Sequence, residues 1–365
     1  MKILHCADIH LGSSLETHLD ETQAKDLRNS MLKSFSNMVE KGSEQGARLV
    51  LIAGDLFDSS AVDRKTEHYV LDTVRQHPEM DFLCLSGNHD GGFAFSNEWK
   101  TLPNFKPFSS EEWTSYSYDD GNGKLTVSGY GGSLSEKVLE SFPQTEGTHL
   151  AVLHGQISSS YGEDRIVLRS LAGKGIDYLA LGHYHTYQTG KLDSRGLYAY
   201  SGCLSGRGFD ECGEHGYVCL DIDVMAMEGS RVRMTFCPLP GLLFRTVSVD
   251  LSEAHTLQDI EKIAKKTLDA SASAEDAVKV ILTGNCDPDL ELDIPYLLSE
   301  WKGKYYFLKI QNDCRLAISP ESYREDISLR GEFVRQVMAS DLPEEKKDRI
   351  LQYGLAALRG EELAL

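Results

Sequence analysis

The chain has 365 residues, more than one typical hydrophobic core accommodates, so its length favours two or three domains. Its longest apolar runs are far below the roughly 20 residues that a membrane-spanning helix needs, and its first residues, MKILHCADIH, do not continue as a signal peptide. The net charge of −19 argues against a protein that holds nucleic acid by its overall charge, and it suits a site that collects cations. These features predict a cytoplasmic protein without a membrane segment.

The eight cysteines include no C-x-x-C pair, and most of them stand among apolar residues that are typical of strands. In a long chain without a secretion signal, this distribution predicts reduced and mostly buried thiols. It argues against a disulfide framework and against a zinc knuckle.

Short apolar runs alternate with helical stretches in the first half of the chain. KILHCAD precedes a helix predicted near 20–41, LVLIAGD precedes another near 63–76, and FLCLSGNHD forms a third strand. Later strands are expected at KLTVSGYGG, HLAVLHG and YLALGHYH, and then at GLYAYSG, HGYVCLDI and RVRMTFCPL, which follow one another like antiparallel strands. This order predicts an α/β fold over residues 1–240, a two-layered β-sandwich flanked by helices.

A smaller unit is predicted after PLPGLLF. Its strands are expected at 244–250, 277–283 and 304–311, and its helices at 255–270 and 292–302. A βαβαβ unit of this length predicts a small α/β capping domain over 241–318.

The last part of the chain, 319–365, is predicted to form C-terminal helices. A second helix is expected to begin at Asp341, with Glu344 three residues on as in a capping box. The apolar positions at helical spacing are Leu329, Phe333, Val334, Val337, Met338, Leu351, Leu355 and Leu358. These stripes either pack on the protein's own core or dock on a helical partner, and the sequence leaves both open.

Polar side chains follow the ends of five predicted strands. They are Asp8 and His10 in CADIHLG, Asp55 in AGDLFD, Asn88 and His89 in SGNHD, His154 in LHG, and His183 and His185 in GHYH. Each motif alone has an ordinary structural explanation, such as a turn asparagine or a histidine at a strand end. Open α/β sheets build their sites where strands finish, so five such motifs together predict one shared site.

The spacing within the motifs suggests how they meet. In an Asp-x-His pair directly after a strand, alternation points both side chains to the same side, so both can reach one ion. His183 and His185 have the same spacing, and each can serve a different ion of a close pair. The glycines before Asp55, Asn88 and His183 allow tight turns that bring the backbone close to the ions.

Nitrogen and oxygen donors without a thiolate suit two ions of the Mn, Fe or Zn type better than a structural zinc. One ion is expected on Asp8, His10 and His185, the other on Asn88, His154 and His183, with Asp55 between both. Two ions about 3.5–4 Å apart clamp the oxygens of an in-line displacement at phosphorus and activate a water. His89 is then free to contact the phosphoryl oxygens and to protonate the leaving oxygen.

The series ADIHLG, GDLFD, GNHD, LHG and GHYH resembles the motifs of the calcineurin-like metallophosphoesterase superfamily. With YSGCLSGRGFDECGEHGYVCLDI and the small capping domain, the chain is similar to the SbcD/YhaO-type DNA repair exonucleases. The resemblance implies the metallophosphoesterase fold, the ligand and His89 roles given above, and a Mn-dependent 3′-to-5′ exonuclease and endonuclease acting on DNA. It also implies an SMC-like ATPase of the SbcC type as a partner, while a homodimer is left open.

Three functions stay open, of which a DNA exonuclease or endonuclease is favoured. The alternative is a phosphodiesterase or phosphatase acting on a small-molecule or protein substrate, because the metal site fixes the reaction and not the leaving group. The third is a non-catalytic scaffold subunit of an SMC-like ATPase complex. The intact ligand set argues against it, because carboxylates buried together without a metal would repel. Arg207, Arg231 and Arg233 are candidate phosphate contacts, although each alone is more typical of an ordinary surface arginine.

Overall fold

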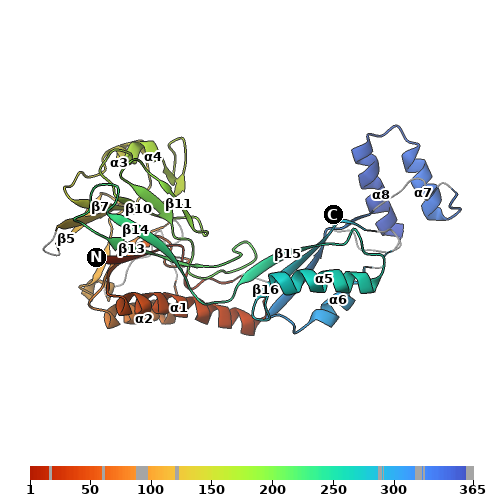
Figure 1. Cartoon of the computed structure of the whole chain (residues 1–365), viewed down its shortest axis with the longest axis horizontal. Coiled ribbons are helices and arrows are strands. Elements are labelled where there is room, and N and C mark those ends of the chain that lie inside the picture. Colours follow the sequence, from red (N-terminus) through yellow and green to blue (C-terminus); the bar gives the residue numbers. More distant parts are fainter. Residues whose placement is uncertain are drawn as a thin grey trace. The chain divides into compact units, whose positions relative to one another are not determined.

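The computed structural model describes residues 1–15, 19–59, 62–87, 98–119, 123–286, 290, 292–316, 323 and 325–358 (Figure 1). The chain divides into two compact units, Met1–Leu243 and Phe244–Leu365. Within the described ranges, no helix has the length and the apolar character that crossing a bilayer requires. All eight cysteines are free thiols and most are buried, as the sequence predicted.

Two six-stranded mixed sheets form the first unit. The first sheet has the order β14 (Val232–Pro238), β13 (Gly216–Ile222), β1 (Lys2–Cys6), β2 (Ala47–Ala53), β3 (Asp81–Leu85) and β4 (Phe105–Pro107). The second has the order β11 (Gln188–Lys191), β12 (Leu197–Tyr200), β10 (Tyr178–Gly182), β7 (Thr148–His154), β6 (Lys124–Gly129) and β5 (Thr114–Asp119). Four neighbouring strands of each sheet are parallel, and the flanking strands are antiparallel.

Parallel strands that are buried on both faces have continuous apolar sequences, and the strands β2, β7 and β10 show this pattern. Leu51 and Leu83 of the first sheet belong to the core between the sheets, together with Val127 and Leu150 of the second. The predicted two-layered sandwich is therefore confirmed.

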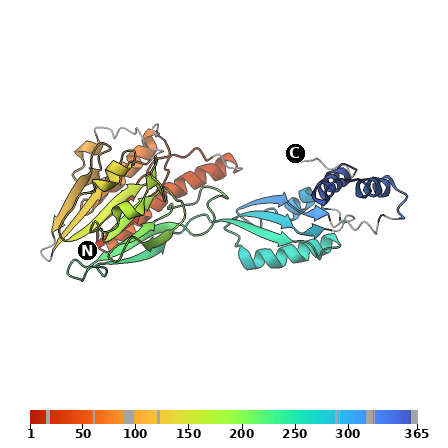
Figure 2. The same cartoon turned by 90° about the horizontal axis from the view of Figure 1, so that it is seen from above.

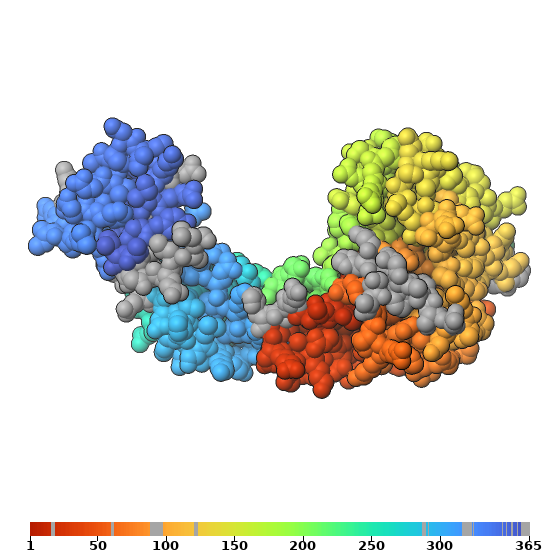
Figure 3. Space-filling model, turned by 180° about the vertical axis from the view of Figure 1, so that it is seen from behind, coloured from red at the N-terminus to blue at the C-terminus, as the bar shows by residue number. Residues whose placement is uncertain are grey.

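Helices cover the outer faces of the sandwich. The helices α1 (Glu21–Glu44) and α2 (Arg64–Gln76) lie side by side along the first sheet, shown in red and orange in Figure 3. α1 begins with a capping box, in which Asp20 accepts from the Gln23 N–H at 2.8 Å and Gln23 Oε1 accepts from the Asp20 N–H at 3.2 Å. Leu139 of α3 (Glu136–Glu140) and Leu171 of α4 (Leu168–Leu171) pack on the outer face of the second sheet. The short elements are β8 (Gln156–Ile157), β9 (Arg165–Ile166) and the 3-10 helix η1 (Trp99–Thr101).

One prediction of strand pairing was wrong. GLYAYSG forms β12, which pairs in parallel with β10 in the second sheet. The next two runs form β13 and β14, which pair antiparallel in the first sheet. An apolar run does not specify its partner strand, and the turns of residues 201–215 carry the chain from one sheet to the other.

The second unit contains a parallel sheet of three strands with the order β15 (Phe244–Asp250), β16 (Ala277–Thr283) and β18 (Phe307–Asn312). The helices α5 (Leu257–Ser271) and α6 (Ile294–Trp301) connect these strands, and β17 (Asn285–Cys286) pairs with β19 (Arg315–Leu316). Figure 2 shows α5 (teal) along one face of the sheet. The predicted βαβαβ order is present, whereas the limits 241–318 and 319–365 stay a prediction.

The C-terminal helices are α7 (Leu329–Met338) and α8 (Glu344–Leu358). Val334, Leu351 and Leu355 form a small buried cluster, so the two apolar stripes pack on each other. The ends of the stripes are less covered, because Leu329 is 71% and Leu358 39% exposed.

The two sheets of the first unit approach closely where β10 passes β2. A Cβ atom on Gly182, the last residue of β10, would lie 2.0 Å from the carbonyl oxygen of Ala53 and 2.9 Å from Cβ of Ala7. Glycine at this position therefore sets the spacing of the two strands whose ends carry the candidate site.

We expect Gly182→Ala to lower the free energy of unfolding by about 3 kcal/mol, because the obstructing atom belongs to the backbone and cannot move aside. Urea unfolding measures this change. Gly241→Ala is the matched control, since the nearest atom to its added Cβ is 3.9 Å away, and it should stay within about 0.5 kcal/mol of wild type. Equal stability of the two variants would contradict the close approach of the strands.

Candidate metal centre

Two loops at the carboxyl ends of β1 and β2 are joined by backbone hydrogen bonds. The N–H of Asp8 donates to the carbonyl oxygen of Gly54 at 3.1 Å. The N–H of His10 donates to the carbonyl oxygen of Asp55 at 2.9 Å. The sandwich thereby fixes the backbone that carries three of the predicted ligands.

Several candidate ligands have an unusual backbone conformation. Asp8, His10 and Asp55 have φ angles of 51°, 48° and 51°, and His183 has a φ of 116°. A non-glycine residue in such a conformation costs about 1–3 kcal/mol, and such residues cluster at functional sites. These turns bring Asp8 and His10 together. Asp8 and His10 come together as predicted, but through these positive φ angles and not through the alternation of an extended backbone.

The glycines of the motifs make room for the ligands. Gly54 has a φ of 94°, as the predicted tight turn requires, and its Cβ would lie 2.3 Å from Nδ1 of His154. A Cβ on Gly87 would lie 2.1 Å from Oδ1 of Asp55. The close approach of side chains to the backbone, more than turn geometry alone, therefore requires glycine.

The described candidates form two groups that share Asp8. One ligand atom from each of Asp8, His10 and His185 lies within 4.8 Å of the others, and the same holds for Asp8, Asp55 and His154. Asp8 and Asp55 are almost fully buried. Each group has the donor types that hold a divalent cation.

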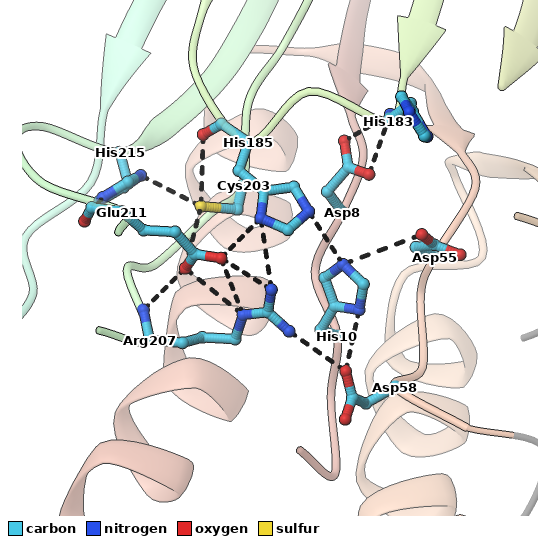
Figure 4. A network of polar contacts seen from close by, with 10 residues as sticks. All are labelled: Asp8, His10, Asp55, Asp58, His183, His185, Cys203, Arg207, Glu211 and His215. Carbon is cyan, nitrogen blue, oxygen red and sulfur yellow. Dashed lines mark hydrogen bonds and ion pairs between the residues drawn. The ribbon is translucent and has the colours of Figure 1, made fainter. Parts of the chain in front are cut away.

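His183 lies beside the second group. Its backbone N–H donates to both carboxylate oxygens of Asp8, at 2.9 and 3.0 Å (Figure 4). Its ring centroid lies 5.5 Å from that of His154. His185 thus belongs to the first group, and the ring of His183 lies beside His154 of the second group, while their assignment to different ions stays a prediction. Asn88 and His89 lie outside the described residues.

Carboxylates hold the outer ring nitrogens of His10 and His185. Nδ1 of His185 lies 2.6 Å from Oε1 of Glu211, and Nδ1 of His10 lies 3.0 Å from Oδ1 of Asp58. In neutral rings that carry their protons on Nδ1, each Nε2 has a lone pair. The two Nε2 atoms face each other at 3.3 Å, so one cation bound by both would fit the geometry. Without a cation, the hydrogen bond to Glu211 raises the pKa of His185 and favours its protonated ring.

A backbone carbonyl orients the ring of His154 in a similar way. Its Nδ1 donates to the carbonyl oxygen of Ala53 at 2.9 Å. Its buried Nε2 lies 3.5 Å from Oδ2 of Asp55 and has no hydrogen bond from the described part of the chain. An unsatisfied buried nitrogen costs about 1–3 kcal/mol, which a bound cation would relieve.

Burial shapes the charges of the site. It raises the pKa of Asp8 to about 6 and lowers the pKa of His183 below its usual value. Burial also acts to raise the pKa of Glu211, but hydrogen bonds from His185 and Arg207 outweigh it and hold that pKa well below its usual value. Glu211 therefore stays ionised at neutral pH, and His183 stays neutral as a ligand must.

Sequence reasoning missed Asp58 and Glu211 and interpreted Arg207 differently. The guanidinium of Arg207 lies between the two carboxylates, with NH1 3.1 Å from Oδ1 of Asp58 and NH2 2.7 Å from Oε1 of Glu211 (Figure 4). The second aspartate of GDLFD and the four-residue spacing of Arg207 and Glu211 were the available signals.

The other two candidate phosphate contacts lie elsewhere in the first unit. Arg231 donates to the carbonyl oxygen of Gly147 at 3.0 Å and lies 3.6 Å from Asp177. Arg233 is exposed on β14. Neither is linked to the candidate ligands by these contacts.

Residues 1–187 match the family described as Calcineurin-like phosphoesterase. The "Uncharacterized metallophosphoesterase YhaO" of Bacillus subtilis is 25% identical over 313 residues, which are 81% of this chain and 74% of that protein. The "DNA double-strand break repair protein Mre11" of Aeropyrum pernix is 26% identical over 258 residues, 63% of this chain and 61% of that protein. A solved dimetal phosphatase from Danio rerio aligns over 65% of this chain and 99% of its own at 12% identity, with a TM-score of 0.41.

The chain thus spans about three quarters of YhaO and less than two thirds of this Mre11 protein. The family match covers 187 of 365 residues, which is just over half of the chain. It includes every predicted ligand and His89. The chain belongs to the calcineurin-like phosphoesterase family and is a metal-dependent phosphoesterase, a hydrolase with a candidate dimetal site at the ends of its strands.

Proposed function

We propose that this phosphoesterase cleaves the phosphodiester bonds of DNA, as an exonuclease or endonuclease. The observation that carries the reaction type is the convergence of two ligand groups on the shared carboxylate of Asp8. The similarity to proteins named for DNA double-strand break repair supports DNA as the substrate. The 3′-to-5′ polarity, an SMC-like ATPase partner and a homodimer stay predictions.

The two groups suggest how the ions divide the ligands. The first ion would be held by Asp8, His10 and His185, and the second by His154, His183 and Asn88. Asp55 would be shared, because its Oδ2 lies 3.8 Å from Nε2 of His10 and 3.5 Å from Nε2 of His154, while Asp8 also lies within reach of both groups. When bound, such ions lower the pKa of a water and stabilise charge on phosphoryl oxygens. The nitrogen and oxygen donors favour Mn²⁺, with Fe or Zn as alternatives.

The remaining roles fall to side chains that do not hold an ion. Asp58 and Glu211 keep the histidines of the first group in the tautomer that directs Nε2 inward. His89, placed by the GNHD motif beside a ligand, would contact the phosphoryl oxygens and protonate the leaving oxygen.

A local surface is needed to hold DNA, because the net charge of −19 is unfavourable for it. In the second unit, Val278 and Val280 pack in the core with α5, so Lys279 lies on the opposite face of the sheet. Lys279 is directly paired with Lys309, and Thr246 extends the same row across the sheet. We propose that this face contacts the phosphate backbone of DNA.

A phosphodiesterase or phosphatase acting on a small substrate is the second candidate. The net charge of −19 favours it, since a small phosphate ester needs no extended basic surface. The shared reaction chemistry means that the substrate, and not the metal centre, separates the two candidates.

The purified protein with Mn²⁺ should cleave labelled single- or double-stranded DNA as well as bis-p-nitrophenyl phosphate. Lys279→Glu with Lys309→Glu should weaken DNA binding by at least about tenfold and lower its logarithmic salt slope by about two. Hydrolysis of the small ester should stay unchanged.

The matched control is Lys265→Glu with Lys266→Glu, the same charge change on exposed positions of α5. It should affect DNA binding far less than the change on the sheet face. Cleavage of the small ester without any cleavage of DNA would contradict the nuclease and support the second candidate.

Asp55→Asn should abolish hydrolysis and lower the bound metal, because a shared carboxylate holds both ions. His89→Ala should instead keep two ions while the rate falls by roughly 10²–10⁴-fold, the usual contribution of positioned acid–base help. Elemental analysis and the hydrolysis rate of bis-p-nitrophenyl phosphate measure both effects. Loss of metal from the His89 variant would refute this division of roles.

Mn²⁺ should stabilise the protein more at about pH 7.5 than at about pH 5.5, because protons compete with the cation for its ligands. The Asp8 carboxyl, with a pKa raised from 3.8 to about 6, is ionised at the higher pH and mostly protonated at the lower. Without the cation, the stability of the protein should change with pH in the opposite direction. A raised carboxyl pKa favours folding at low pH, and this contribution to stability is lost as pH rises through about 6.

Thermal unfolding with and without Mn²⁺ at both pH values tests this. At about 100 times its Kd, Mn²⁺ contributes about 2.7 kcal/mol. Asp8→Asn should reduce the effect at both pH values. An equal effect of Mn²⁺ on the wild-type protein at both would argue against Asp8 as a ligand.

A further inference from the structure

Arg207 joins the two carboxylates that hold the histidines of the first ion group (Figure 4). Its NH1 donates to Asp58 at 3.1 Å, and its NH2 and Nε donate to Oε1 of Glu211 at 2.7 and 3.1 Å. Asp58 in turn contacts Nδ1 of His10, and Glu211 contacts Nδ1 of His185. One guanidinium therefore connects the supports of both rings, although Asp58 and Arg207 are 149 residues apart.

The second ion group has no comparable arrangement among the contacts of His154, whose Nδ1 donates to the neutral carbonyl of Ala53. The first group is surrounded by two carboxylates and one guanidinium, a more negative set of supports. A carboxylate behind a histidine raises the basicity of the ligand and fixes its orientation. The histidines of the first group thus differ from His154 in the charge behind their rings.

The position of Arg207 is built into the fold. The side chain of Glu211 is 4% exposed and that of Arg207 20%. The backbone N–H of Arg207 also donates to Oε2 of Glu211 at 2.8 Å. A buried carboxylate needs such compensation, because removing one partner of a buried pair leaves an uncompensated charge. The planar guanidinium of arginine can donate to two carboxylates at the same time. The single ammonium group of lysine cannot reproduce this geometry.

We propose that Arg207 is a positioning residue that sets the affinity of the first ion site. It holds Asp58 and Glu211 in place so that Nε2 of His10 and Nε2 of His185 converge on one cation. This inference rests on the two-ion centre of the proposed function and does not depend on the substrate. Direct contact of Arg207 with phosphate is the competing role, and the contacts already made by its Nε, NH1 and NH2 oppose it.

The test is a titration of the metal-free, full-length protein with Mn²⁺, in which the free ion is followed by electron paramagnetic resonance. We expect Arg207→Met to weaken one of the two binding steps by about 10–100-fold, the usual effect of losing such a support, and to leave the other step unchanged. Arg207→Lys should recover part of the loss. Glu211→Gln, which keeps the size of the side chain, should weaken the same step and serves if Arg207→Met does not fold.

Arg195→Met is the matched control. The side chain of Arg195 is 19% exposed. Its Nε and NH2 donate to Asp177 at 2.9 and 2.7 Å, and its NH1 donates to Glu228 at 2.7 Å. None of these partners belongs to the candidate ion groups. Its loss should lower stability while both Mn²⁺ affinities stay as in the wild type.

Unchanged affinities in a folded Arg207→Met protein would overturn the positioning role. Unchanged affinities with a raised KM for bis-p-nitrophenyl phosphate would overturn it in favour of a phosphate contact. Equal weakening of both steps would also overturn it, since the role is specific to one site. A wild-type protein that binds fewer than two ions would instead contradict the two-ion centre on which the inference rests.

Discussion

Two buried carboxylates, Asp8 and Asp55, are the constraint on which the rest of the site depends. They stand at the ends of neighbouring parallel strands in a place where water does not screen them. Like charges in such surroundings repel strongly, and each is costly to bury alone. The imidazoles of His10 and His154 approach Asp55 to within 3.8 and 3.5 Å. Carboxylates and neutral imidazoles gathered in this way have cations as their natural complement.

The sandwich supplies the rigidity that such a cluster needs. The candidate ligands come from loops after β1, β2 and β10 and from the end of β7, strands that belong to two different sheets. The backbone N–H of His183, directly after β10 of the second sheet, donates to Asp8 in the loop after β1 of the first, so the site also links the two sheets. The strained φ angles of Asp8, His10 and Asp55 persist because backbone hydrogen bonds and the core hold these loops.

The sequence predicted those parts that local patterns determine. Buried parallel strands appear as apolar runs, and the polar residue after a run lies at the strand end, so the sequence predicted Asp8, Asp55 and His154 as candidate ligands that the structure brings together. The pairing of β12 was not predictable, because an apolar run is compatible with either sheet. Asp58 and Glu211 were missed for a related reason, since their roles depend on contacts with histidines and an arginine that are distant in the chain or bring no motif of their own.

The layers around the centre have different functions. The candidate metal ligands suit phosphoester hydrolysis, and the family to which the chain belongs has the same chemistry. In our proposal, the charged side chains of Asp58, Glu211 and Arg207 orient the rings of His10 and His185. We propose that the choice of substrate depends on other surfaces, among them the face of the second unit that carries Lys279 and Lys309.

The most direct test of the account is anomalous diffraction from crystals of the full chain grown with Mn²⁺. We predict two metal peaks, one in contact with Nε2 of His10 and of His185 and the other in contact with His154 and His183, with the carboxylate of Asp55 touching both. A single peak, or metal bound away from these residues, would contradict the two-ion centre.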